Sequence, residues 1–211
     1  MLKVLFEDRD LLVVSKPAGL VVDGGEREDS FELLVRAHAG PGVFPFHRID
    51  RATSGIVLYG KTKVHAAAIT QGFEKKQIRK AYLAVVEGDW KPEWNRVESD
   101  VDGKTALTTY RLMGRAANFS LIEALPKTGR KHQIRIHCKE KGCPIVGDTL
   151  HGASGGEPGV PPLEQALHAY KLSFKHPGTG DAISILDIPE HWRETYLAGF
   201  EWDAITSRLK R

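Results

Sequence analysis

The 211-residue sequence lacks the features that mark several large classes of protein. It has only two cysteines, Cys138 and Cys143, which excludes a disulfide framework and favours a reducing compartment. No apolar run is long enough to cross a bilayer. The apolar residues 2–6 are interrupted by Lys3 and followed by acidic residues, which does not match a secretory signal. We therefore expect a cytoplasmic protein without a membrane segment.

Motifs for cofactors and metals are missing as well. The sequence has no glycine-rich phosphate loop and no GxSxG elbow, which disfavours nucleotide cofactors and serine hydrolysis. Three histidines and two cysteines occur between His132 and His151, but their spacing fits no zinc pattern well. The net charge of +3 would suit a polyanionic partner and is too small to demonstrate one. We predict no cofactor and no metal.

What the sequence does contain is typical of a globular α+β protein, with 41% hydrophobic and 27% charged residues. Short aliphatic and aromatic runs bounded by turn residues predict a mixed, mostly antiparallel central sheet. The predicted strands lie at 11–14, 56–58, 82–86, 106–112, 119–124 and 132–137, with a hairpin formed by 172–174 and 183–186. The length favours one domain over residues 1–211, or two closely fused halves.

Three helices are expected to flank the sheet. Ser30 is a suitable N-cap for a short helix that Gly40 ends, and Thr62 can cap a second helix carrying Ile69. Pro189 can open a C-terminal helix that carries Trp192, Tyr196 and Phe200. Residues 152–162 are rich in glycine and proline, which predicts a mobile surface loop.

The stretch from His47 to Leu58 is the best candidate for a catalytic site. Asp50 lies between two arginines, and small polar residues then lead into an apolar strand. A carboxylate on a loop beside the core is well placed for chemistry, because the scaffold holds it still. Taken alone, the pattern also fits a turn-capping Asp50 that pairs with Arg48 at the surface.

A second candidate stretch runs from Thr128 to His137. If it is a strand, Ile134 and Ile136 share one face while Arg135 points to the other. An arginine fixed in this way could keep a carboxylate ionised through a bidentate contact. An ordinary solvent-facing strand residue would show the same pattern.

Six blocks, in order along the chain, resemble the RluA family of pseudouridine synthases. They are VLFED at 4–8 with LVVSKPAG at 12–19, HRIDRATSGIVL at 47–58, KAYLAVVEG at 80–88, TGRKHQIRIH at 128–137, GCPIVGD at 142–148, and LHA at 167–169 with FKHP at 174–177. The resemblance covers nearly the whole chain. It departs from the family pattern at Ile49, where leucine is usual, and at Cys143, where histidine is usual.

The resemblance implies a pseudouridine synthase fold with a catalytic cleft, and an enzyme that isomerises a specific uridine in tRNA or rRNA after flipping it from the stack. It implies Asp50 as the catalytic aspartate, Arg135 as its guanidinium partner, and Tyr82 as a residue that stacks on uracil. Arg48 matches the position that fills the space left by the flipped base. The S4-type RNA-binding domain of many relatives is absent from the sequence, and we expect a monomer that needs no protein partner.

The remaining candidates are RNA contacts from the second stretch, namely Arg130, Lys131 and His132. For each of them a solvated surface side chain is the simpler interpretation.

Two other functions stay open at this point. A metal-independent nuclease could use His47, His132 or His137 as acid and base, and it would cleave RNA with little dependence on Asp50. A noncatalytic RNA-binding module would keep its function when Asp50 is replaced.

Overall fold

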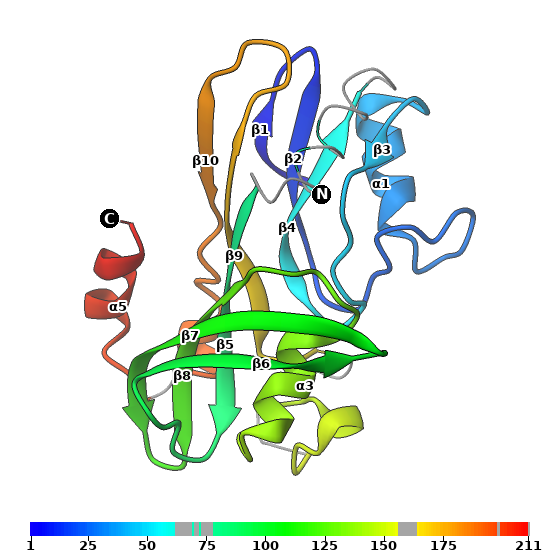
Figure 1. The fold of residues 1–211 in the computed structure, drawn as a ribbon. Helices are drawn as coiled ribbons and strands as arrows, with labels where there is room; N and C mark the ends of the chain where they lie inside the picture. Colours follow the sequence, from blue (N-terminus) through cyan, green and yellow to red (C-terminus); the bar gives the residue numbers. More distant parts are fainter. Residues whose placement is uncertain (62–68, 70–71, 73–77, 156–163, 198, 211) are drawn as a thin grey trace. The chain divides into compact units, whose positions relative to one another are not determined.

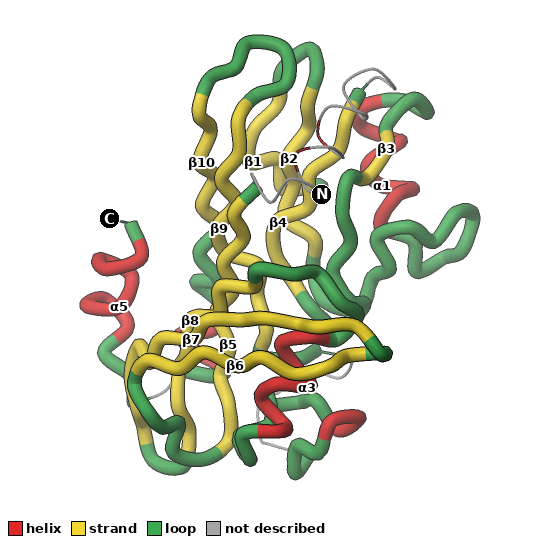
Figure 2. Tube along the Cα trace, in the orientation of Figure 1, coloured by secondary structure: helices red, strands yellow, loops and turns green. Residues whose placement is uncertain are grey.

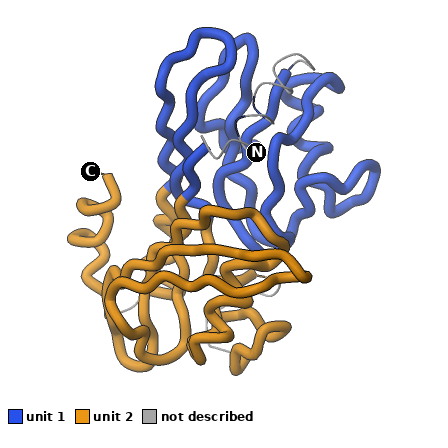
Figure 3. The backbone as a smooth tube through the Cα atoms, viewed as in Figure 1, with its two compact units in different colours: residues 1–80, 169–187 blue, residues 81–168, 188–211 orange. Residues whose placement is uncertain are grey.

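The computed structural model describes residues 1–61, 69, 72, 78–155, 164–197 and 199–210. They fall into two compact units, coloured separately in Figure 3. Unit 1 comprises residues 1–80 and 169–187, and unit 2 comprises residues 81–168 and 188–211. Each unit contains antiparallel strands together with helices (Figure 1, Figure 2), so the predicted α+β class is confirmed. None of the described helices has the length and apolar character needed to span a bilayer.

Unit 1 is a sheet whose strands run in the order β1-β2-β4-β9, with β10 paired to β9 and β3 paired to β4. Its elements are β1 (Lys3–Glu7), β2 (Leu11–Lys16), α1 (Phe31–Ala39), β3 (Phe44–Pro45), β4 (Ser54–Gly60), β9 (Leu167–Lys175, which begins in unit 2) and β10 (Ala182–Leu186). The antiparallel register of β2 and β4 places Lys16 opposite Gly55. The end of β2 therefore lies beside the start of β4, just after Asp50 in the chain.

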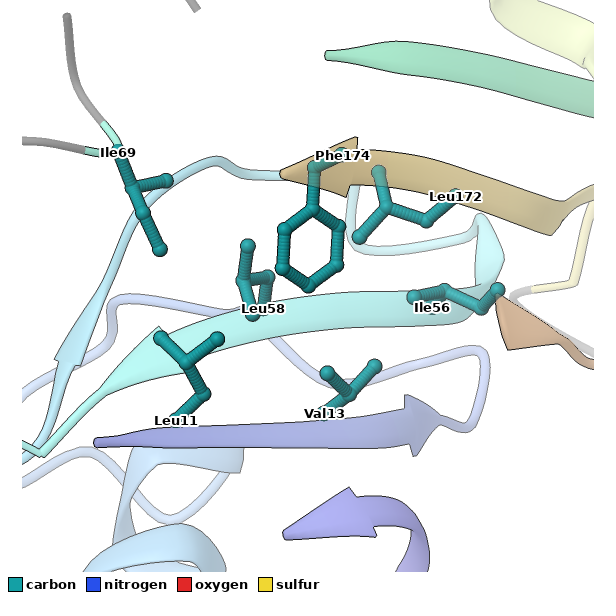
Figure 4. Close-up of a cluster of buried hydrophobic side chains, with 7 residues drawn as sticks. All are labelled: Leu11, Val13, Ile56, Leu58, Ile69, Leu172 and Phe174. Carbon is teal, nitrogen blue, oxygen red and sulfur yellow. The ribbon is translucent and has the colours of Figure 1, made fainter. Parts of the chain in front are cut away.

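Alternate residues of β2, β4 and β9 line one face of the sheet and, with Ile69, form a core cluster of unit 1, because successive side chains of a strand point to opposite faces. Figure 4 shows this cluster, which consists of Leu11, Val13, Ile56, Leu58, Ile69, Leu172 and Phe174. Burying each such side chain stabilises the fold by about 1.5–3 kcal/mol. The end of β4 that follows Asp50 is thus anchored in the core.

The predicted first helix is confirmed with both of its ends. Ser30 is the N-cap of α1, and Gly40 is the C-cap with a φ of 87°. The N–H of Gly40 donates to the carbonyl of Arg36 and closes the last turn. Glycine suits this position because a positive φ costs it nothing.

Unit 2 is built on strands in the order β5-β8-β7-β6, with antiparallel pairing between β5 and β8, β8 and β7, and β7 and β6. Its elements are β5 (Arg79–Glu87, which begins in unit 1), β6 (Trp94–Val101), β7 (Lys104–Ala116), β8 (Phe119–Pro126), α3 (Gln133–Glu140), the 3-10 helix η1 (Thr149–His151), α4 (Trp192–Thr195) and α5 (Trp202–Leu209). Helix α3 contacts β6, β7 and η1. Asp102 and Gly103 join β6 to β7, and both have the positive φ that such hairpin turns favour.

The prediction of a strand at 132–137 is wrong, because residues 133–140 form the helix α3. Ile134 and Ile136 alternate as in a strand, but the buried Ile134, His137 and Cys138 follow the helical spacing i, i+3, i+4. The prediction that Ile134 and Arg135 lie on opposite faces of a strand is therefore wrong as well. Both side chains are buried in the helix.

The C-terminal prediction of one helix needs a similar correction. Two short helices, α4 and α5, take its place, with Tyr196 capping the first and Phe200 between the two. Gly199, with a φ of 91°, lies in the interruption. The helix predicted after Thr62 lies outside the described residues apart from Ile69 and Gly72, as does the part of the predicted loop at 156–162.

Candidate functional site

Asp50 begins a tight turn that leads directly into β4. The N–H of Thr53 donates to the carbonyl of Asp50 at 3.1 Å, and β4 starts at Ser54. Ile49 is buried on one side of Asp50, whereas Arg48 is exposed. Asp50 itself is partly exposed. The carboxylate is therefore reachable while the backbone on both sides of it is held.

A second chain segment braces this turn. The carbonyl of Arg51 accepts hydrogen bonds from the N–H of Gly19 at 2.8 Å and from Nζ of Lys16 at 3.2 Å. The Nε of Arg51 donates in return to the carbonyl of Gly19 at 2.9 Å. The Lys-Pro-Ala-Gly turn after β2 thus holds the residue that follows Asp50.

Lys16 is completely buried, although it carries a charge-bearing group. Its Nζ also donates to the carbonyls of Pro17 and Leu20, both at 2.8 Å, so three acceptors match the three N–H groups of an ammonium. Burial lowers the pKa of Lys16 to about 7, and the negative charge of Asp50 opposes this shift. Lys16 was not among the residues predicted for the site. The available signal was a lysine at the end of a strand that begins with four aliphatic residues.

His47 supports the same loop from its other side. Its Nε2 accepts the N–H of Leu58 at 3.2 Å, which ties the segment before Asp50 to β4. Burial, together with the positive charge of Lys80, lowers the pKa of His47 to about 3. A histidine that stays neutral across the physiological range is a poor proton donor, and this argues against the nuclease role considered for His47.

In unit 2, the guanidinium of Arg135 forms a buried two-pronged ion pair with Asp148. Its Nε and Nη2 donate to the two carboxylate oxygens of Asp148, each at 2.7 Å. The side chains of Arg135 and Asp148 are 6% and 1% exposed. The pair fixes the orientation of the guanidinium, because a planar fork and a carboxylate fit each other in one plane. The partner role of Arg135 toward Asp50 stays a prediction.

Gln133 locks the loop that precedes α3. Its side-chain oxygen accepts from the hydroxyl of Thr128 at 2.7 Å and from the N–H of Arg130 at 3.0 Å. Its side-chain nitrogen donates to the carbonyl of Leu107 and the hydroxyl of Thr108 in β7. All four hydrogen-bonding positions of this buried amide are thereby used. The loop that carries Arg130, Lys131 and His132 is therefore tied to the sheet.

The predicted RNA contacts of this loop lie at the surface. Arg130 and Lys131 are exposed, and His132 is partly exposed with a left-handed φ of 55°. Nδ1 of His132 lies 3.1 Å from Nε2 of His151 in η1. No role was predicted for His151, because its partner His132 lies 19 residues away in the chain.

Tyr82 lies near the start of β5, where it pairs with Ala124 of β8. It is 8% exposed, so most of its ring is packed in the protein. Its predicted stacking on uracil is not tested by these contacts.

His137 is fully buried in α3 and has its ring edge-on to Tyr110, with 6.3 Å between centroids. Burial lowers the pKa of His137, and Glu140 opposes this shift. His137 therefore lacks the access to solvent that an acid or base for RNA cleavage requires. Among the described residues, no group of three or more histidine, cysteine, aspartate or glutamate side chains could hold a metal ion.

A profile of the RNA pseudouridylate synthase family matches residues 10–140, which contain the Asp50 turn and Arg135. The tRNA pseudouridine synthase C of Haemophilus influenzae is 33% identical over 97% of this chain and 100% of its own length. The ribosomal large subunit pseudouridine synthase C of Haemophilus ducreyi is 33% identical over 92% of this chain and 68% of its own length.

A solved structure of similar fold is titled human RNA pseudouridylate synthase domain containing 1. It has a TM-score of 0.80 at 22% identity, and the match covers 100% of this chain and 95% of the other. At this identity the likeness supports the fold, and it agrees with the fold that the sequence blocks imply.

Proposed function

Because the chain belongs to the RNA pseudouridylate synthase family, and is an RNA pseudouridine synthase of the RluA type, we propose that it modifies a uridine of tRNA or ribosomal RNA through Asp50. Support for the substrate class comes from relatives named for tRNA and for the large ribosomal subunit. A stem-loop of tRNA is favoured, because the relative matched over its whole length is a tRNA enzyme.

The reaction breaks the bond between N1 of uracil and C1′ of ribose, turns the base, and joins C5 to C1′. The proton lost from C5 is balanced by the proton gained at N1, so no redox partner or second substrate is needed. An ionised carboxylate can act as nucleophile at C1′, as base at C2′, or by addition to the ring. Each route needs Asp50 ionised and held at a fixed position.

The braced turn is the observation that carries this proposal. The carbonyl of Arg51 accepts hydrogen bonds from Lys16 and Gly19, and the N–H of Thr53 donates to the carbonyl of Asp50. A carboxylate on such a turn has little freedom to move, which reduces the cost of placing it against the ribose. The buried ammonium of Lys16 adds a positive charge near the ionised acid.

We propose that Arg135 is the guanidinium partner of Asp50. The two-pronged pair with Asp148 fixes the orientation of its guanidinium, because a planar fork and a carboxylate fit each other in one plane. Asp148 would then act as the anchor of Arg135. A lysine at position 135 could not serve both carboxylates in fixed geometry.

The flipped nucleotide would be received by Tyr82 and Arg48. Tyr82 would stack on uracil and assist removal of the C5 proton, while the exposed Arg48 would fill the gap in the RNA stack. Arg130, Lys131 and His132 would contact phosphates, because these side chains lie on one surface loop that Gln133 holds to the sheet.

We further propose that residues 1–211 act as one catalytic domain in the cytoplasm, as a monomer without cofactor or obligatory protein partner. The support is chemical, since the isomerisation is balanced within the substrate. Size-exclusion chromatography of the active enzyme with light scattering tests the monomer.

The deciding experiment compares the wild type with Asp50→Asn on unmodified tRNA and ribosomal RNA. Pseudouridine is mapped by carbodiimide treatment and primer extension, and RNA binding is measured separately. Asp50→Asn should bind RNA with unchanged affinity and form no product, whereas Asp100→Asn, a matched change on the exposed face of β6, should retain activity. Product formation by Asp50→Asn would refute the catalytic role. Cleaved RNA with either protein would instead identify a nuclease.

A further inference from the structure

His132 and His151 form a histidine pair that the catalytic proposal does not use. The two nitrogens lie 3.1 Å apart, and the rings meet edge to face at an interplanar angle of 86°. His132 precedes α3 and His151 ends η1, two elements in contact. Both side chains are partly exposed. The pair is therefore fixed by the fold and accessible from solvent.

The geometry of the pair determines how many protons it can hold. At 3.1 Å one ring nitrogen must carry hydrogen and the other must accept it. When both rings are neutral, Nδ1 of His151 carries a hydrogen in only one of the two tautomeric arrangements. When the pair takes up one proton, Nδ1 of His151 always carries a hydrogen, and the bond between the rings becomes charge-assisted. One proton thus makes Nδ1 of His151 a hydrogen-bond donor in both arrangements and gives the pair a positive charge, without breaking the hydrogen bond between the rings.

Several charged groups act on His151 from its surroundings. Burial lowers the pKa of His151; the carboxylate of Asp148 opposes the shift, whereas Arg135, His132 and Lys139 add to it. The charge of Asp148 is already matched by its two-pronged bond to Arg135. Without a ligand, these surroundings therefore favour the neutral form of His151, and an added anion beside it would favour its protonation.

The neighbouring loop favours an anion of one kind. Arg130 and Lys131, directly before His132, are exposed, and the loop is held to the sheet by Gln133. Cationic donors around a surface imidazole pair suit a phosphodiester, which accepts hydrogen bonds and cannot donate them.

We propose that His151, paired with His132, is an RNA phosphate contact that takes up one proton when RNA binds, so that RNA affinity falls as pH rises. This inference rests on the RNA substrate of the proposed function. The bound phosphate places a negative charge beside His151 and raises its pKa above the lowered value of the unliganded protein. Between these two pKa values, one linked proton changes the affinity by up to about tenfold per pH unit.

The first test measures the dissociation constant of a tRNA stem-loop at about pH 5.5 and about pH 7.5, the range in which histidine titrates. Wild type should bind about tenfold more weakly at the higher pH. His151→Gln, whose amide donates without titrating, should change less than about threefold and show a salt dependence shallower by about one phosphate contact. His38→Gln, a change at the exposed histidine that is hydrogen-bonded to Glu7 in unit 1, should behave as wild type. Equal pH dependence in His151→Gln and wild type would overturn the inference.

A second measurement needs no variant and stands even if His151→Gln is unstable. The histidine ring signals of the wild-type protein are titrated by NMR with and without the stem-loop. The pKa of His151 should rise by about one unit on RNA binding, and an unchanged pKa would overturn the inference. Both measurements report binding, so they are separate from the pseudouridine assay. An enzyme that forms pseudouridine but shows no proton uptake at His151 refutes this inference alone.

Discussion

Replacing Asp148 tests whether the buried ion pair holds Arg135 in place. Asp148→Ala leaves the guanidinium of Arg135, whose side chain is 6% exposed, without the carboxylate that accepts two hydrogen bonds at 2.7 Å. Removing one member of a buried ion pair costs about 3–5 kcal/mol, because the remaining charge is uncompensated. For a chain of this size each kcal/mol lowers the melting temperature by about 2–4 °C, so a fall of about 6–20 °C is expected.

The matched control is Asp203→Ala. It breaks the pair between Arg193 and Asp203, which has a similar distance of 2.9 Å but side chains that are 57% and 81% exposed. Exposed pairs contribute at most about 1 kcal/mol, so this variant should melt within about 4 °C of wild type. Comparing the melting temperatures of the two variants separates the effect of burial from the effect of losing an ion pair as such.

The assay is thermal unfolding followed by circular dichroism, combined with pseudouridine formation below the melting temperature of each variant. Asp148→Ala should lose activity even where it is folded, because Arg135 no longer has a fixed orientation. Asp203→Ala should remain active. If Asp148→Ala melted within about 2 °C of wild type, the assignment of a stabilising buried pair would be wrong. Full activity in the folded variant would show that Arg135 needs no anchor.

Two further substitutions test the support of the Asp50 turn. Gly55→Ala places a Cβ 2.4 Å from the carbonyl oxygen of Ala169 at a φ of +113°, and should lower the free energy of unfolding by about 2–6 kcal/mol in urea. The control Gly180→Ala also has a positive φ but open space around the new Cβ, so it should destabilise the protein less. Equal losses of stability in the two variants would contradict the clash at Gly55. Lys16→Met removes an amine whose pKa is about 7 in the folded protein and about 10.4 in the unfolded chain. Between these pH values the unfolded wild type binds one proton more than the folded protein, so its free energy of unfolding rises with pH. In Lys16→Met the slope of this rise should be smaller by the contribution of one proton. Equal pH slopes in the two proteins would show that Lys16 does not titrate as argued.

Much of the fold could be predicted from local sequence. Three segments were predicted correctly: the aliphatic run at 11–14, the capped segment from Ser30 to Gly40, and the paired runs at 172–174 and 183–186. Short apolar runs between turn residues indicate strands, and a helix is marked by its caps and by apolar residues at helical spacing. The strand β6 was missed. Its exposed residues include Trp94, Arg96 and Glu98, and of its inward residues only Val101 is buried, so the apolar alternation is weak.

Helix α3 shows where local pattern fails. Isoleucine, arginine and isoleucine at 134–136 alternate as a strand would, over a window too short to separate a period of two from one of 3.6. Tertiary contacts decided the outcome. Two hydrogen bonds of Gln133 tie the start of the helix to β7, and Ile134, His137 and Cys138 are buried.

For the site, the sequence by itself determined the family, the Asp50 motif and the family-matched residues, because these are contiguous blocks whose order is visible in one chain. Only the tertiary structure decided which partners those residues meet. Asp148 anchors Arg135 from 13 residues away, Lys16 braces Arg51 from 35 residues away, and His151 pairs with His132 across 19. Hydrogen bonds and ion pairs act over a few ångströms. Which polar groups lie that close is decided by folding, because burying the apolar faces of strands and helices brings residues together that are distant in the sequence.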